Sequence, residues 1–182
     1  MAAIEFWSSD RRFGVRFGEE EIQSIRDLCM AANRGETGGI LIGFYTERHD
    51  CAVVTAVTGP TSDSRVGRTW FYRGVRGLQN LLDRLWHRRR HYYLGEWHFH
   101  PGAVPHPSPV DVDQLKQIAA SQEYRCPEPV LLVVGGDPAA HWSMRSYVFP
   151  GGQDPLPLTG PGDFVGPDNR SDGRNVGRRT VS

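Results

Sequence analysis

The chain is 182 residues long, 38% of them hydrophobic, and carries 21 basic and 21 acidic side chains. This length and hydrophobic content support one sizeable core and argue against two full domains. The balanced charge provides no overall positive field for nucleic acid or an anionic membrane, and no apolar run approaches the roughly 20 residues that span a bilayer. Since the opening residues also lack the apolar stretch of a signal peptide, we expect a cytoplasmic protein that binds neither nucleic acid nor membrane.

The three cysteines, Cys29, Cys51 and Cys126, are widely separated, and the sequence contains no CxxC pair. An odd number at such spacing argues against a disulfide framework and against a thiolate zinc site. We expect all three to be reduced and to pack as small hydrophobic residues.

The first elements in chain order are a strand at 12–17 and a helix at 19–34, whose apolar residues recur on one face. Gly35 follows as a typical helix end, so Glu36 stands at the junction between this helix and the next strand. Residues 38–60 have apolar and β-branched residues on both sides of a short polar cluster, which predicts a hairpin.

The rest of the chain continues to alternate between strands and helices. The expected elements are a strand at 69–72, a helix beginning at 78, a strand at 92–100, a helix beginning near 109, and strands at 129–135 and 143–149. This order predicts an α/β fold, a mixed β-sheet sandwiched by helices, in a single domain of residues 1–149. Residues 150–182 are rich in Gly, Pro, Asp and Arg with few apolar side chains, which predicts a flexible tail.

Two histidines occupy alternate positions near the end of the expected strand at 92–100. Alternate side chains of a strand project from one face, so His98 and His100, about 6.6 Å apart along the backbone, can both reach one metal ion. A catalytic zinc takes three protein ligands and leaves a position for water. Asp111 is the natural third ligand, because the Pro-rich loop can return the start of the next helix to the end of the strand. A carboxylate outside the ligand set would then take a proton from the water.

The stretch HFHPGAVPHPSPVD reads as HxH, seven residues, a serine, two residues and an aspartate, and ETGGILIG lies upstream. This combination resembles the JAMM motif of the JAB/MPN zinc metallopeptidase family. The resemblance implies one zinc ion per chain, held by His98, His100 and Asp111. It also implies that Glu36 is the general base and that Ser108 helps to hold the oxyanion or the water.

The sequence leaves open a second role for some of these residues. Ser108 and Asp111 also form a helix start, a capping box that would exist without any metal. Glu96 lies two residues before His98 on the same expected face, so it either contacts a ligand histidine or substrate, or has a plain surface role. His106, in the Pro-rich loop, is more simply a bystander than a functional group.

Other zinc chemistries need motifs that this chain lacks. A zincin requires HExxH, and a nucleobase deaminase requires HxE followed by PCxxC. Neither pattern is present in the sequence. A metal-free MPN scaffold is the remaining alternative of another class, but a scaffold has no reason to keep the complete set of ligands and base.

The residues around the motif, YYLGEWHFHP and PHPSPVD, resemble the compact prokaryotic JAB branch of integrative elements and antiviral operons. In CBASS systems such a peptidase accompanies an E1/E2-like enzyme and removes a conjugated cyclic-nucleotide synthase, a nucleotidyltransferase, from its targets. The leading prediction is therefore cleavage after the C-terminus of a ubiquitin-like tag or of such a synthase. The alternative within the enzyme class is processing of a ubiquitin-like or sulfur-carrier precursor. An extended tag tail would pair with an exposed edge, for which residues 59–72 are the candidate.

Overall fold

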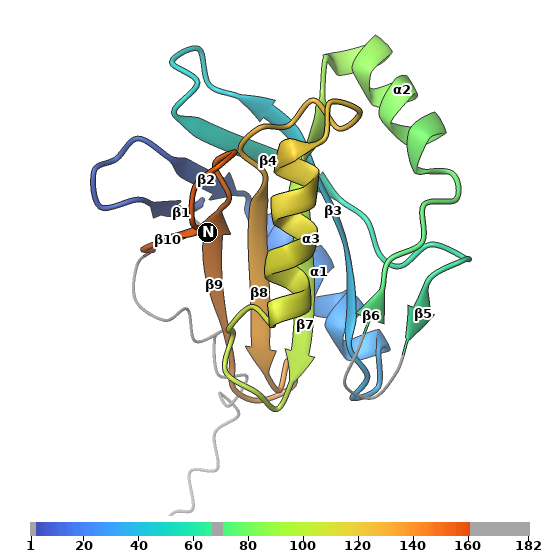
Figure 1. Ribbon diagram of the computed structural model, residues 1–182. Coiled ribbons are helices and arrows are strands. Elements are labelled where there is room, and N and C mark those ends of the chain that lie inside the picture. The colour runs from blue at the N-terminus through green and yellow to red at the C-terminus, as the bar shows by residue number, and fades with distance from the viewer. Residues whose placement is uncertain (1–2, 67–70, 161–182) are drawn as a thin grey trace, which may run out of the picture.

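The computed structural model describes residues 3–66 and 71–160 (Figure 1). The helices among them are α1 Glu19–Ala31, α2 Leu78–Arg89 and α3 Pro109–Ala120. The strands are β1 Ile4–Trp7, β2 Gly14–Phe17, β3 Thr37–Tyr45, β4 Cys51–Val57, β5 Arg65–Val66, β6 Phe71–Tyr72, β7 Tyr92–Pro101, β8 Val130–Gly136, β9 Trp142–Val148 and β10 Leu156–Leu158. Within the described residues, no helix is long and apolar enough to cross a membrane.

Eight of the strands form one mixed sheet in the order β1-β2-β4-β3-β7-β8-β9-β10. The pairs β2–β4 and β7–β8 are parallel, and the other neighbouring pairs are antiparallel. The two edges of the sheet meet, because the backbones of Trp7 and Thr159 exchange two hydrogen bonds of 2.8 Å each. The predicted mixed α/β fold is therefore confirmed, and the sheet is closer to closure than a simple sandwich.

Helices cover both faces of the sheet (Figure 1). On one face, Ile22, Ile25 and Cys29 of α1 join an apolar core with the sheet. On the other face, Leu115 and Ile118 of α3 join a second core. The sheet is thus buried on both sides, as expected for strands with near-continuous apolar runs.

β7 lies in the middle of the sheet, paired with β3 and β8. Glu96 and His98 face α3, whereas Trp97 packs in the core under α1. Strict strand alternation predicts Leu94 on the same face as Glu96. This prediction is wrong, because Leu94 packs with Trp97 on the opposite face. The cause is a shift in the β3–β7 register at Gly95, whose φ of +151° and closeness to the Val130 backbone admit only glycine.

The chain folds beyond the boundary predicted at residue 150. β10 pairs with β9, and Leu158 is buried in the core under α1. A boundary between 1–149 and 150–182 is therefore too early, because a three-residue edge strand between prolines and glycines is too short to show alternation in sequence. Residues 161–182 of the expected tail lie outside the described residues, as do residues 69–70 of the expected strand at 69–72.

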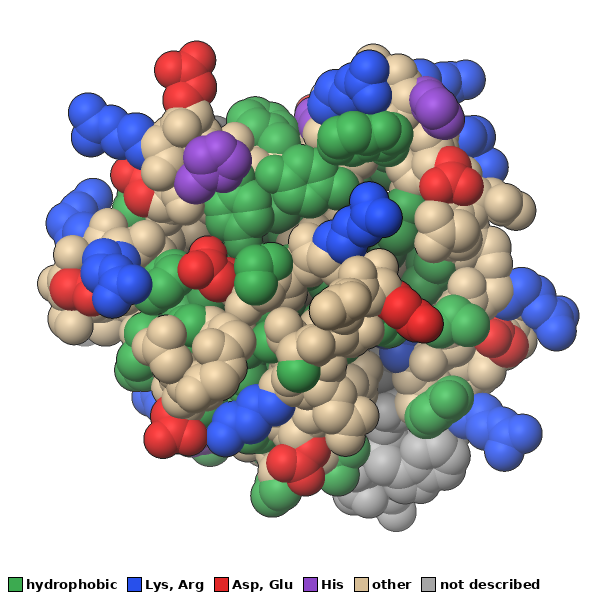
Figure 2. All heavy atoms as spheres, turned by 45° about the horizontal axis from the view of Figure 1, so that its top comes forward, with side chains coloured by type: hydrophobic (Ala, Val, Ile, Leu, Met, Phe, Trp, Pro, Cys, Tyr) green, Lys and Arg blue, Asp and Glu red, His purple; other side chains and the backbone are tan. Residues whose placement is uncertain are grey.

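α2 makes looser contact with the sheet than α1 and α3 do. Of its residues only Leu78 is buried, and a cavity of about 760 Å³ lies between the helix and the sheet. Figure 2 shows apolar side chains gathered on the face that comes forward when the top of Figure 1 is turned toward the viewer. Phe44 and Trp86 are exposed. Below α2, the strands β5 and β6 form a separate two-stranded ribbon.

Candidate active site

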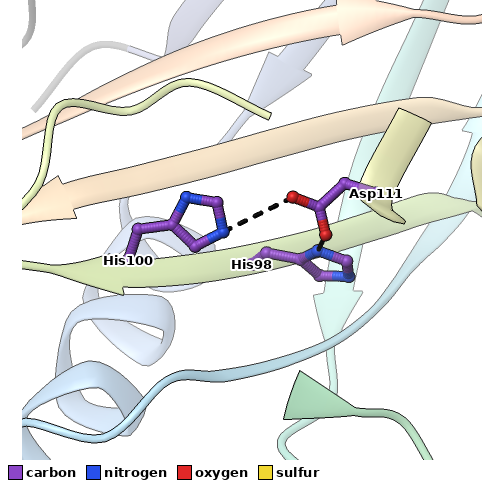
Figure 3. A group of neighbouring side chains, drawn as sticks. All are labelled: His98, His100 and Asp111. Carbon is purple, nitrogen blue, oxygen red and sulfur yellow. Dashed lines mark hydrogen bonds and ion pairs between the residues drawn. The ribbon is translucent and has the colours of Figure 1, made fainter. Parts of the chain in front are cut away.

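The two histidines of β7 and the first turn of α3 meet at one end of the sheet (Figure 3). Ligand atoms of His98, His100 and Asp111 all lie within 4.8 Å of one another. His98 Nδ1 is 2.6 Å from Asp111 Oδ1, and His100 Nε2 is 3.4 Å from Asp111 Oδ2. The structure thus brings together the three residues that sequence analysis named as metal ligands.

The position of Asp111 is set by the start of α3. Ser108 is the N-cap residue: its hydroxyl accepts a hydrogen bond from Asp111 N, and its own N–H donates to Asp111 Oδ2 at 2.7 Å. Pro109 occupies the first helical position, where a missing N–H costs nothing. The capping box is therefore present, and it aims the same carboxylate at both histidines. The two roles considered for Asp111, as cap and as ligand, are compatible.

Charge at the site is concentrated on buried groups. Burial by itself lowers the pKa of His98, but hydrogen bonds to Asp111 and Glu96 outweigh it and raise the pKa to about 9. Burial raises the pKa of Asp111, but contacts with His100 and His98 hold it well below its ordinary value. A proton shared by an imidazole and a carboxylate is what a divalent cation displaces when it binds such a pair.

Glu36 directly precedes β3, whose first residue, Thr37, pairs with Phe99 at the end of β7 that bears the histidines. It lines a cavity of about 300 Å³ together with His98, His100, Ser108 and Asp111. The side chain is half-buried, and burial is the largest cause that raises the pKa of its carboxyl above the ordinary value. The structure therefore places a carboxylate beside the ligand set without making it one of the three grouped ligands.

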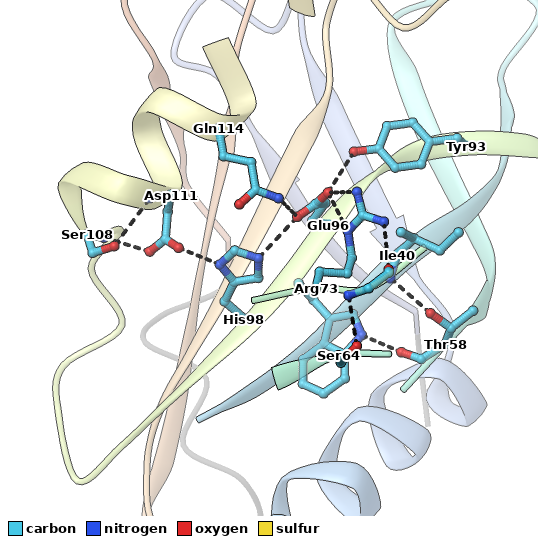
Figure 4. A network of polar contacts seen from close by, with 12 residues as sticks. Ile40, Thr58, Ser64, Arg73, Tyr93, Glu96, His98, Ser108, Asp111 and Gln114 are labelled. Atoms are coloured by element: carbon cyan, nitrogen blue, oxygen red, sulfur yellow. Dashed lines mark hydrogen bonds and ion pairs between the residues drawn. The ribbon is translucent and has the colours of Figure 1, made fainter. Parts of the chain in front are cut away.

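Glu96 is fully buried, which excludes the plain surface role that sequence analysis left open. Its Oε2 lies 3.2 Å from His98 Nε2 and accepts a hydrogen bond from Gln114 of α3 at 2.9 Å. Its Oε1 accepts from Arg73 Nε at 2.8 Å and from the Tyr93 hydroxyl at 3.4 Å (Figure 4). Although burial raises the pKa of this carboxyl, His98 and Arg73 hold it below its ordinary value.

Sequence reasoning did not identify Arg73 as part of this cluster. Arg73 is distant in sequence from Glu96 and comes from the segment that follows β6, so no local pattern links the two residues. His106 does line the same cavity as the metal ligands, but it is exposed, and its Nε2 is 3.1 Å from Arg145 Nη1. His106 therefore makes a contact outside the ligand cluster.

Comparison with known proteins agrees with this geometry. Residues 18–148 match the model of a family described as prokaryotic homologs of the JAB domain. The chain belongs to this family. A CD-NTase/cGAS isopeptidase of Enterobacter hormaechei subsp. hoffmannii is 42% identical over 155 residues, covering 85% of this chain and 86% of that protein. A probable metalloprotease, y4qB, of Sinorhizobium fredii is 31% identical over 116 residues, covering 62% and 70%.

A solved structure supports the fold alone. Protein DSY2949 of Desulfitobacterium hafniense, determined in solution, aligns with a TM-score of 0.56 at 17% identity and covers 76% of this chain and 86% of that chain. Because the chain belongs to the JAB family and carries the JAMM motif, it is a JAMM-type hydrolase. Its candidate metal site consists of two imidazoles and one carboxylate.

Proposed function

We propose that this JAB protein is a zinc-dependent isopeptidase that cuts after the C-terminus of a conjugated cyclic-nucleotide synthase or a ubiquitin-like tag. The observation that carries the proposal is the cavity in which Glu36 lies beside His98, His100 and Asp111. The substrate class is supported by the 42% identity to a protein named CD-NTase/cGAS isopeptidase.

The donor set fits zinc. Two imidazole nitrogens and one carboxylate oxygen are the ligands of open catalytic zinc sites, in which a fourth position takes water or substrate. In this protein His98, His100 and Asp111 would hold the ion, one per chain. When bound, zinc acts as a Lewis acid and lowers the pKa of a water at that position to about 7.

Glu36 acts as the general base in this proposal. Its half-buried carboxylate lines the cavity, accepts a proton from the attacking water and returns it to the leaving amine. Its raised pKa brings the carboxyl closer to the pH at which such transfers are efficient.

Ser108 is proposed to stabilise the oxyanion. Its oxygen accepts the N–H of Asp111, which leaves the hydroxyl hydrogen to be donated toward the cavity. Because Ser108 also caps α3, its hydroxyl is fixed in position before substrate arrives. It can then donate a hydrogen bond to the developing negative charge.

The tag tail is proposed to lie along residues 59–72, which include β5. The ribbon of β5 and β6 is not part of the main sheet, so its strands have edges that can pair with an extended peptide. An E1/E2-like enzyme of the same operon is the proposed source of the conjugate. Processing of a ubiquitin-like or sulfur-carrier precursor uses the same site and differs only in the bond presented to it.

The decisive variant is Glu36→Gln, assayed on a fusion of a cyclic-nucleotide synthase C-terminus to a reporter. We expect zinc content and fold to be unchanged, while the cleavage rate falls by about 10² to 10⁴, the usual contribution of a general base. Glu20→Gln, an exposed glutamate of α1, is the matched control and should cleave at the rate of the unmodified protein.

Two results would contradict the proposal at different levels. If Glu36→Gln cleaves as fast as the unmodified protein, the JAMM mechanism is wrong for this chain. If the unmodified protein holds zinc but cuts neither a synthase fusion nor a ubiquitin-like fusion, the deconjugation role is wrong.

A further inference from the structure

The carboxylate of Glu96 lies between the metal site and the ribbon of β5 and β6. It is fully buried and is not among the residues that line the catalytic cavity. A buried carboxylate is costly unless it is paired and hydrogen-bonded, and here four side chains share that task. They are Arg73, Tyr93, His98 and Gln114. So complete a set of partners on one hidden group points to a function beyond packing.

The two ring nitrogens of His98 face different carboxylates. Nε2 lies 3.2 Å from Glu96 Oε2, on the buried side, and Nδ1 lies 2.6 Å from Asp111 Oδ1, on the side of the other ligands. When Glu96 accepts a hydrogen from Nε2, the lone pair for a metal is on Nδ1. A carboxylate that orients a ligand histidine in this way fixes both its tautomer and its ring angle.

Arg73 connects this arrangement to the ribbon. Its Nε and Nη2 each lie 2.8 Å from Glu96 Oε1, and its side chain is nearly as buried as that of Glu96 (Figure 4). Arg73 directly follows β6, and its Nη1 also contacts the carbonyl of Gly74, whose N–H donates to Ser64 Oγ at 2.9 Å. Ser64 directly precedes β5. A continuous series of polar contacts therefore runs from Asp111 to the base of the ribbon.

We propose that Glu96 and Arg73 are positioning residues: Glu96 holds His98 with Nδ1 toward the metal, and Arg73 couples that ligand to the β5–β6 ribbon. The inference rests on the proposed metal-binding role of His98 and deepens it. Arg73 contacts no metal ligand, yet its loss weakens metal binding. By reciprocity, metal binding orders the segment that anchors the ribbon.

Zinc affinity tests the first half of the proposal without any substrate. Competition against a chromophoric chelator should show Arg73→Gln and Glu96→Gln binding zinc about 10- to 100-fold more weakly than the unmodified protein, the usual cost of removing such a partner. Arg73→Lys keeps the charge and should recover part of the loss. Arg76→Gln, an exposed arginine of the same segment, is the control and should bind as the unmodified protein does.

Circular dichroism in the presence of chelator establishes which variants are folded. If Arg73→Gln is not folded, Arg73→Lys takes its place in the zinc-binding test. Failure of the unmodified protein to bind zinc would overturn the proposed function together with this inference. If the unmodified protein binds zinc, and the folded Arg73 variants bind it as tightly as Arg76→Gln does, the inference alone is overturned.

Long-range ¹H–¹⁵N spectra of the zinc-loaded protein test the orientation of His98 directly. We expect the proton on Nε2, next to Glu96, and the metal on Nδ1. A proton on Nδ1 with the metal on Nε2 would overturn the role of Glu96. A carboxylate with a purely structural role would not determine which ring nitrogen carries the proton.

Hydrogen exchange tests the coupling to the ribbon. The amides of Gly74 and Val75 bond to Ser64 Oγ and Asp63 Oδ2 at 2.9 and 3.1 Å. Adding zinc to the unmodified protein should slow the exchange of these two amides. In Arg73→Gln, saturating zinc should not slow their exchange. Equal slowing in Arg73→Gln and in Arg76→Gln, or none in the unmodified protein, would overturn the coupling.

Discussion

The two faces of β7 are made by alternate residues of one strand but are stabilised in opposite ways. On the face toward α1, Trp97 and Phe99 are buried in a core of apolar side chains. On the face toward α3, Glu96 and His98 are just as buried but are held by ion pairs and hydrogen bonds. The apolar face therefore supplies stability, whereas the polar face lowers it in order to hold charged groups at fixed positions.

The largest expected effect on stability is on the apolar face. Trp97→Ala should lower the free energy of unfolding by about 3–5 kcal/mol, because it removes the largest side chain that is fully buried among the described residues and leaves the Thr58 carbonyl without its indole donor. Urea unfolding in the presence of chelator measures this loss. Trp86→Ala, at an exposed position of α2, should cost far less. Equal costs for the two tryptophans would contradict the assignment of stability to this face.

A smaller effect is expected where the same apolar core reaches the edge of the sheet. Removing residues 150–182 takes away Leu158, whose burial contributes about 1.5–3 kcal/mol, whereas removing residues 161–182 keeps the pairing of β10 with β9 and the bridge between Thr159 and Trp7. Thermal melting of the two truncated proteins should therefore give a clearly lower Tm for the longer deletion. Identical melting temperatures would show that β10 adds nothing to the core.

The smallest effect on stability is expected on the polar face, at a residue with a large effect on the metal. Asp111→Ala should abolish stoichiometric zinc binding, yet lower the unfolding free energy in chelator by only about 1 kcal/mol, the cost of a lost cap. Asp113→Ala, exposed on the same helix, is the control for both measurements. Elemental analysis gives the zinc content, and retention of one zinc per chain by Asp111→Ala would remove this residue from the ligand set.

Sequence could predict the parts of the site that depend on local periodicity. Strand alternation placed His98 and His100 on one face, and the helix-start pattern placed Asp111 at the first turn of α3. Alternation failed at Leu94, because a register shift depends on how β3 and β7 pair and not on either strand alone.

Contacts between segments far apart in the chain were not predictable. Arg73 is one of many arginines in the sequence, and nothing near it indicates that it pairs with Glu96. Only the packing of the segment after β6 against β7 selects it. β10 was missed for a related reason, since its place in the sheet is determined by β9 and by the backbone of Trp7.

The hydrogen bonds between Trp7 and Thr159 have a consequence for synthesis of the protein. A ribosome adds about 5–20 residues per second, so β1 exists for many seconds before the residues that it meets at the other end of the sheet are made. During that time the paired β1 and β2 present an open strand edge, and such an edge can pair with another nascent chain. We therefore expect aggregation during expression to be sensitive to changes in β1 and β10 that disturb little in the finished fold.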